Sequence, residues 1–160
     1  MVAVEARERV YGLTRAAAKL SEAGDALGRL YLNKLVSRAE MEAGRQYEML
    51  RRSVDSISMT KRIVSSADWD RMRGFDGDEG DNPAYIEYCE WVDRRYYESR
   101  KALLDAGPLV MPAVDWWVIE GTEAWAVLGS LRLGLKALAE LYRITLWVDE
   151  PVDNPLDESE

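Results

Sequence analysis

The chain has 160 residues, of which 48% are hydrophobic and 31% are charged, and its formal net charge is −8. This length and composition are typical of one globular domain and exclude a disordered chain. The sequence contains no histidine and a single cysteine, Cys89. These counts exclude Ser–His and Cys–His nucleophile pairs, histidine or thiolate metal cages, and an internal disulfide. We therefore expect a protein that is not an enzyme and has no catalytic, cofactor or metal site.

The charge is distributed unevenly along the chain. Residues 1–75 carry a net charge of +4, whereas residues 76–148 and residues 149–160 each carry −6. A basic surface near the N-terminus is therefore compatible with an acidic chain, and the overall charge does not exclude a nucleic-acid partner.

The N-terminal part, residues 1–53, predicts three helices of basic character. Apolar residues at helical spacing indicate the first helix over residues 3–20. Asp25 is a favourable N-cap, and the residues after it predict a short second helix over residues 26–35.

The third helix, over residues 38–53, begins with a capping box in which Ser37 and Glu40 satisfy each other's backbone amides. The tight corner before it is typical of a helix-turn-helix, but an ordinary corner of a helical bundle has the same outline. Basic residues on the exposed side of this helix and just beyond it are the candidate nucleic-acid contacts. They are Arg38, Arg45, Arg51, Arg52, Lys61 and Arg62.

Residues 54–82 are expected to form a long irregular connector, with a helical turn at about residues 67–73. The run from Asp76 to Asp81 has the acidic composition of a calcium-binding loop. Gly80 and Asp81 stand where an EF-hand needs a ligand and a glycine. A solvated acidic loop is therefore the favoured interpretation of this run.

The C-terminal part, residues 83–148, contains the strongest core signal. Asn82 and Pro83 predict the N-cap and the first turn of a helix that ends at about Ala106. Cys89 falls on the apolar side of this helix and is expected to be buried.

Two further helices complete this core. A short apolar helix over residues 112–120 holds two adjacent tryptophans that point about 100° apart, so a monomer would struggle to bury both. Thr122 is expected to cap a last helix over residues 123–144, whose leucines recur at helical spacing. The tryptophans of this region form either the centre of the core or a partner surface: Trp116, Trp117 and Trp125.

Residues 149–160 form an acidic tail without a basic residue, and we expect it to be disordered or loosely docked. No apolar run approaches the ~18 residues that cross a bilayer, and the N-terminus lacks the apolar segment of a secretory signal. We expect a cytoplasmic protein without membrane contact.

Two stretches are similar to known proteins. Residues 26–52, ALGRLYLNKLVSRAEMEAGRQYEMLRR, resemble a segment of small helical proteins of bacteriophages and prophages, some of which are transcription regulators. Residues 107–143, GPLVMPAVDWWVIEGTEAWAVLGSLRLGLKALAELYR, are similar to the end of the same group, where late-gene activators have a sigma-factor-like helix-turn-helix. The middle helix of that unit is missing here. The resemblance implies a phage or mobile-element origin.

The fold we expect is all-α, with one domain of five to six helices over residues 1–148. The first hypothesis for its function is a non-enzymatic regulatory or DNA-transaction protein that contacts nucleic acid through its basic N-terminal helices. A small DNA-packaging subunit belongs to the same class. The alternative is an acidic protein-interaction module or inhibitor that mimics DNA and binds a basic host protein. A homo-oligomer is compatible with either, because a leucine stripe suits dimerisation.

Overall fold

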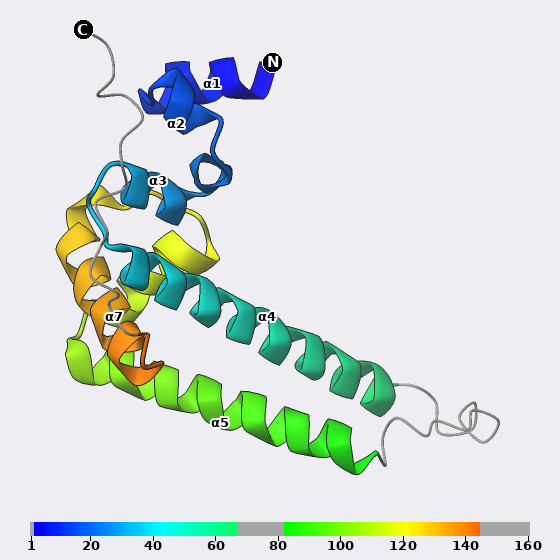
Figure 1. Ribbon diagram of the computed structural model, residues 1–160. Helices are drawn as coiled ribbons and strands as arrows, with labels where there is room; N and C mark the ends of the chain where they lie inside the picture. The colour runs from blue at the N-terminus through cyan, green and yellow to red at the C-terminus, as the bar shows by residue number, and fades with distance from the viewer. Residues whose placement is uncertain (1, 67–81, 145–160) are drawn as a thin grey trace, which may run out of the picture.

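The computed structural model describes residues 2–66 and 82–144, and within these ranges the chain forms helices and no strand. The expectation of an all-α fold is therefore confirmed. In Figure 1 the two longest helices lie side by side and the shorter helices gather at one end of them. The expected turn at 67–73, the acidic run from Asp76 to Asp81 and the acidic tail lie outside the described residues.

The prediction of one continuous helix over residues 3–20 is wrong, because the chain turns at Gly12. α1 (Val2–Tyr11) ends directly before this glycine, whose φ of +62° is in the left-handed region that favours glycine. Thr14 then caps the separate helix α2 (Arg15–Ala18) by accepting a hydrogen bond from a backbone amide of that helix.

The short second helix of the prediction is confirmed, although it ends earlier than expected. The 3-10 turn η1 (Ser21–Gly24) leads into α3 (Ala26–Leu32). The side chain of Asp25 accepts a hydrogen bond from the Gly28 amide, as its position before the helix predicted. Leu30 of α3 is buried in the main core.

The next helix, α4 (Arg38–Ser66), begins with the predicted capping box. The Ser37 amide donates a hydrogen bond to Glu40 Oε2 (2.7 Å), and the Glu40 amide donates one to Ser37 Oγ (3.2 Å). Both partners lie within three residues of each other, so the sequence alone was enough to find this helix start.

The predicted irregular connector is wrong for residues 54–66, because α4 continues through them. Val54 and Ile57 pack against Cys89 and Val92, which belong to the following long helix and are buried. The sequence of these turns is mostly polar and does not predict a buried helix. The contact with α5, a segment distant in sequence, supplies the apolar burial that stabilises them.

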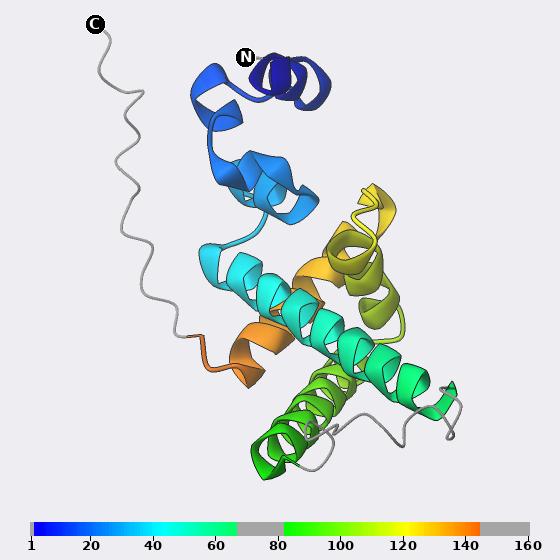
Figure 2. The same ribbon diagram turned by 90° about the vertical axis from the view of Figure 1, so that its right-hand side faces the viewer.

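The following helix, α5 (Pro83–Ala106), has the predicted bounds, and Asn82 Oδ1 accepts a hydrogen bond from the Ala84 amide (3.0 Å). In Figure 1 α4 and α5 run in opposite directions, and in Figure 2 they cross. The two helices form a projecting helical hairpin with a thin apolar layer between them.

The C-terminal helices begin at other residues than predicted. α6 (Val110–Val114) continues into the π-helical segment η3 (Asp115–Ile119). Thr122 caps no helix here: its amide donates a hydrogen bond to the Trp116 carbonyl (2.8 Å) and closes the preceding segment. The 3-10 turn η4 (Trp125–Val127) and then α7 (Leu128–Leu141) follow, so the last helix starts five residues later than residue 123.

The main core lies where α7 packs against α4, α5 and α6. The predicted leucine stripe is confirmed, since Leu131, Leu135 and Leu138 are all fully buried. Two glycines let the helices approach closely. A Cβ on Gly44 would lie 2.5 Å from Leu27 Cδ2, and a Cβ on Gly134 would lie 2.6 Å from Val114 Cγ2.

Among the helices of the described ranges, none taken singly has both the length and the apolar character to cross a bilayer. Within residues 2–66 and 82–144, one pair of segments, α5 with Val110–Ile119, passes such a test of length and composition, and that pair is bent by 119°. Several apolar residues of this pair pack in the core, where Leu103, Val110 and Trp117 are almost completely buried.

Candidate interaction surfaces

Three of the predicted nucleic-acid contacts on α4 are ion-paired within the chain. Arg45 Nη2 lies 3.3 Å from Asp25 Oδ2, Arg51 Nε lies 3.2 Å from Asp55 Oδ2, and Arg52 is paired with Glu48. Arg38 is exposed at the helix start, and the side chains of Lys61 and Arg62 lie outside the described part. Exposed pairs of this kind are weak and exchange partners readily, so contact with phosphates stays a prediction.

Arg51 also has a structural role that sequence reasoning missed. Its Nη1 donates a hydrogen bond to Tyr96 Oη (2.8 Å) of α5, and this bond raises the pKa of the Arg51 guanidinium. Tyr96 in turn stacks on the fully buried Tyr47 with ring centroids 6.0 Å apart. Replacing Arg51 would therefore disturb the contact between α4 and α5 as well as any bound phosphate.

The tryptophans predicted as core or partner surface divide between the two roles. Trp117 is 1% exposed and donates a hydrogen bond from Nε1 to the Ala124 carbonyl (3.1 Å), so it belongs to the core and not to a surface. Trp116 and Trp125 are 38% and 53% exposed. Trp125 covers Trp117 edge to face, with ring centroids 5.2 Å apart. One tryptophan of the adjacent pair thus remains at the surface, as the helical geometry required.

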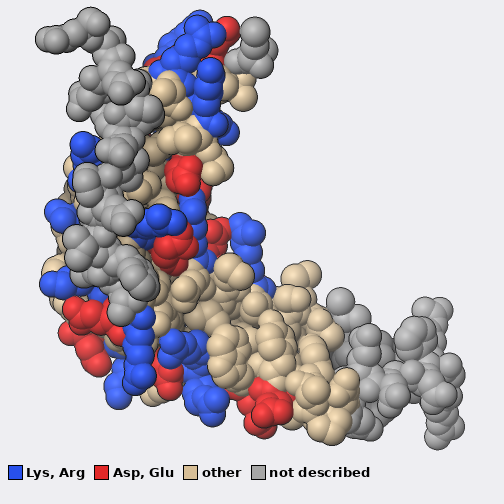
Figure 3. All heavy atoms as spheres, in the orientation of Figure 1, with Lys and Arg blue, Asp and Glu red and all other residues tan. Residues whose placement is uncertain are grey.

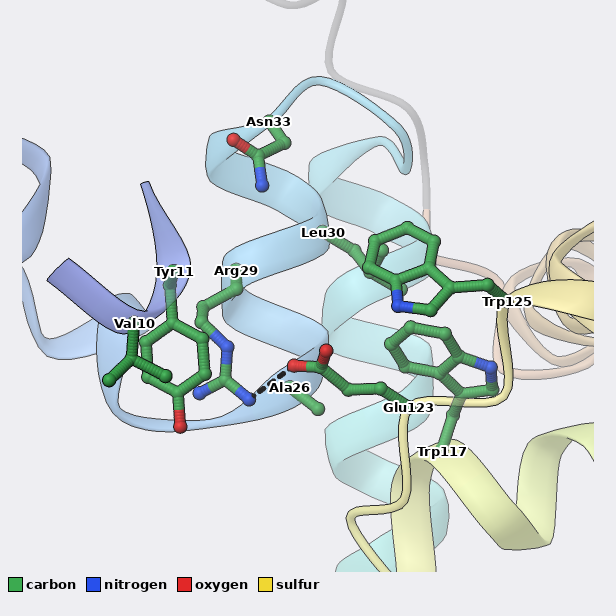
Figure 4. Close-up of a pocket in the computed structure, with 9 residues that line it drawn as sticks. All are labelled: Val10, Tyr11, Ala26, Arg29, Leu30, Asn33, Trp117, Glu123 and Trp125. Carbon is green, nitrogen blue, oxygen red and sulfur yellow. Dashed lines mark hydrogen bonds and ion pairs between the residues drawn. The ribbon is translucent and has the colours of Figure 1, made fainter. Parts of the chain in front are cut away.

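A cavity of about 170 Å³ opens beside this pair of rings, between α3, the end of α1 and the segment from Trp117 to Trp125. Figure 4 shows its walls: the indoles of Trp117 and Trp125 on one side and the stacked Tyr11 and Arg29 on the other. Arg29 Nη2 lies 2.8 Å from Glu123 Oε1, and its Cζ lies 3.9 Å from the centre of the Tyr11 ring.

A second surface lies on the α4–α5 hairpin and consists of side chains that are uncharged at neutral pH. On α4, one stripe of the helix is formed by residues spaced by four, three and four positions: Met49, Ser53, Ser56 and Thr60. Tyr88 of α5 adjoins this stripe, because its Oη donates a hydrogen bond to Ser53 Oγ (3.4 Å). Trp91 follows Tyr88 by three positions and lies beside it on the same helix. Figure 3 shows a largely uncharged area over the part of the hairpin away from α7. We call this surface the hairpin face: Met49, Ser53, Ser56, Thr60, Tyr88 and Trp91.

Sequence reasoning missed the hairpin face because Ser56 and Thr60 fall on residues 54–66, for which the sequence predicts a connector and not a helix. Across the described ranges, no three cysteine or acidic side chains are grouped to hold a metal ion. Comparison with protein-family models, curated proteins and solved structures found no match to this chain.

Proposed function

We propose that this chain is a non-enzymatic interaction protein that assembles through the hairpin face, with a second copy of the chain as the occupant of that face. The observation that carries the proposal is the exposure of Met49, Tyr88 and Trp91, at 68%, 46% and 48%, on one continuous surface. Large apolar side chains scattered singly over a surface are ordinary, but side chains gathered on one surface mark interaction sites.

The hairpin face continues a surface on which a helix already packs. One turn along α5 from Trp91, the Arg95 guanidinium lies 5.0 Å from the centre of the Tyr142 ring at the end of α7. Ser99, a turn further, shares a hydrogen bond of 2.8 Å with Tyr142 Oη. The same side of α5 is thus covered by α7 at one end and bare at the other. A helix of another molecule would find a packing surface there like the one that α7 uses.

The charge of the face favours a second copy over a charged partner. None of the six residues of the hairpin face carries a charge at neutral pH, so a basic or acidic protein would gain no ion pair with them. In a two-fold contact each surface meets itself, and an uncharged surface does so without like-charge repulsion. The serine and threonine hydroxyls and the tyrosine can hydrogen-bond with their own counterparts across the axis.

The wider role that we propose for this assembly is that of a phage-type regulator or a small DNA-packaging subunit, as the resemblance of residues 26–52 and 107–143 suggests. Dimers are common among DNA-binding proteins of this size because two copies contact two half-sites. The arginines of α4 are the proposed phosphate contacts. The alternative, an acidic module that binds a basic host protein, would depend on acids outside the described residues and gains no support from the hairpin face.

A cross-linking experiment tests the face directly. Cys89 is buried, so a cysteine introduced at exposed Ser56 is the reactive thiol of choice. With a short bis-maleimide at low micromolar protein, Ser56→Cys is expected to give covalent dimers. A matched control, Thr122→Cys, is exposed and lies off the face, and it is expected to give few dimers. Equal yields from the two variants, or none from Ser56→Cys, would refute the proposal.

A further inference from the structure

The cavity beside Trp125 has the size and the walls of a site for one flat ring. A cavity of about 150 Å³ lined by apolar side chains accommodates a benzene ring, and this one is about 170 Å³. Its apolar wall includes Leu30 and the half-exposed indole of Trp125. Because Trp117 meets Trp125 edge to face, a face of the Trp125 indole is left for a ligand to stack on.

Polar groups stand on two sides of the ring site. Glu123 Oε1 accepts a hydrogen bond from Arg29, whereas Oε2 accepts none from the described residues, and Figure 4 shows it turned toward the interior of the cavity. The side-chain amide of Asn33 lies at the opposite rim and also has no hydrogen bond within the described ranges. The site therefore presents an acceptor on one side and an amide, which both donates and accepts, on the other.

The charges in the wall favour a neutral ring. Arg29 already neutralises Glu123, and its guanidinium is stacked on Tyr11, so a second cation would meet a positive charge at short range. An anion would meet the remaining carboxylate oxygen of Glu123. A neutral ring with an N–H donor for Glu123 and an acceptor for Asn33 avoids both conflicts. An indole or a phenol offers one such group, whereas a nucleobase offers donors and acceptors around its edge.

We propose that this cavity binds a nucleobase, stacked on Trp125 and held by Glu123 and Asn33. The base comes either from a free nucleotide or from a single strand of nucleic acid, since both present the same ring. Stacking on an exposed aromatic side chain, with hydrogen bonds to the base edge, is how proteins recognise unpaired bases. The site lies apart from the hairpin face and does not depend on self-association.

Side-chain indole N–H signals of the ¹⁵N-labelled full chain provide the test. The probes are the four ribonucleoside monophosphates, and ribose 5-phosphate is the control that lacks a base. We expect saturable shifts of the Trp117 and Trp125 signals with at least one monophosphate and none with ribose 5-phosphate. Failure of all four monophosphates to shift these signals at about 10 mM, or equal shifts with ribose 5-phosphate, would overturn the proposal.

Two matched variants locate the site. Trp125→Ala is expected to weaken binding about tenfold, which is within the range for loss of one base–aromatic stack. Trp116→Ala removes another exposed tryptophan that does not line the cavity and is expected to leave the affinity unchanged. Equal weakening by both variants would contradict the site. Trp91→Glu, on the hairpin face, is expected to keep nucleobase binding even where it abolishes self-association.

The two sources of the base are distinguished with an eight-nucleotide single strand. A strand as the source predicts tighter binding of the octamer than of the monophosphate, with an affinity that falls as salt rises. A free nucleotide predicts similar affinities for the two. Either result supports the site if Trp125→Ala lowers the affinity for the probe about tenfold. If Trp125→Ala binds both the octamer and the monophosphate as tightly as the native chain does, the proposed site is overturned.

Discussion

Tyr47 Oη donates a hydrogen bond of 2.9 Å to Asp115 Oδ1, across 68 positions of the chain. This bond joins the N-terminal half of α4 to the start of η3, and Arg100 of α5 adds an ion pair of 3.0 Å to Asp115 Oδ2. Tyr47 is fully buried. One polar network thus joins α4, α5 and η3, all of which contribute residues to the main core or its edge.

Removing the hydroxyl should destabilise the fold measurably. Tyr47→Phe leaves Asp115 with only Arg100 as its partner, and losing one partner of a part-buried carboxylate costs about 1–2 kcal/mol. The free energy of unfolding from urea titration is the measurement. Tyr97→Phe, at a ring that is 70% exposed, is the control and should change this energy little. Equal stability of Tyr47→Phe and the native chain would show that the network contributes nothing.

The same tyrosine predicts how stability depends on alkaline pH. Burial raises the pKa of Tyr47 above its usual value of about 10, and burial raises the pKa of Tyr142 as well. The unfolded chain then loses these protons at a lower pH than the folded chain does. The stabilising contribution is complete below about pH 10 and is lost as the pH rises beyond it. Unfolding energies at about pH 9 and pH 11 should therefore differ less in Tyr47→Phe than in the native chain, and an equal difference would contradict this assignment.

Two glycines of α7 should respond oppositely to alanine. A Cβ on Gly134 would lie 2.6 Å from Val114 Cγ2 and 2.8 Å from Val110 Cγ1, so Gly134→Ala should cost about 1–3 kcal/mol through overpacking. Gly129 has no atom within 4 Å of its Cβ position, so Gly129→Ala should stabilise the helix by about 0.5–1 kcal/mol. Thermal unfolding should show a lower melting temperature for Gly134→Ala and a higher one for Gly129→Ala than for the native chain. Stabilisation by Gly134→Ala would contradict the close packing of α6 on α7.

Local signals explain which parts of the fold could be predicted. The caps at Asp25, Asn82 and the pair Ser37 and Glu40 involve partners two or three residues apart, so the local sequence is enough to predict them. The leucine stripe of α7 is predictable for the same reason, because all of its residues repeat at helical spacing within one short segment.

Long-range contacts explain the errors. The turns of α4 from Val54 onward are stabilised by Cys89 and Val92, and no pattern within residues 54–66 points to those partners. The network of Tyr47, Asp115 and Arg100 also joins segments far apart in sequence. The candidate surfaces depend on such contacts, so the hairpin face and the cavity beside Trp125 could not be found before the helices were placed.

The nucleic-acid prediction can be tested without disturbing the fold. Arg38 and Arg52 are exposed, whereas Arg51 also holds Tyr96, so Arg38→Ala with Arg52→Ala is the suitable double variant. If both residues contact phosphates of a DNA duplex, the double variant should bind DNA more weakly. In a plot of the logarithm of the binding constant against the logarithm of the salt concentration, the magnitude of the slope should decrease by about two. Arg94→Ala with Arg132→Ala, on α5 and α7, is the control. No DNA binding by the native chain, or an equal loss in the control, would show that the α4 arginines are not the contact.

Sedimentation equilibrium of the native chain, Trp91→Glu and Tyr97→Glu tests the central claim most directly. Trp91 and Tyr97 are both exposed on α5, and six positions of a helix turn them about 120° apart, so only the first lies on the hairpin face. We predict a monomer–dimer equilibrium in the micromolar range for the native chain and for Tyr97→Glu. It should strengthen with salt, because the net charge of −8 repels the copies. Trp91→Glu should weaken it at least tenfold, since the dimer would bury an unpaired carboxylate. A native chain that stays monomeric at high micromolar concentration, or equal effects of the two variants, would contradict assembly through the hairpin face.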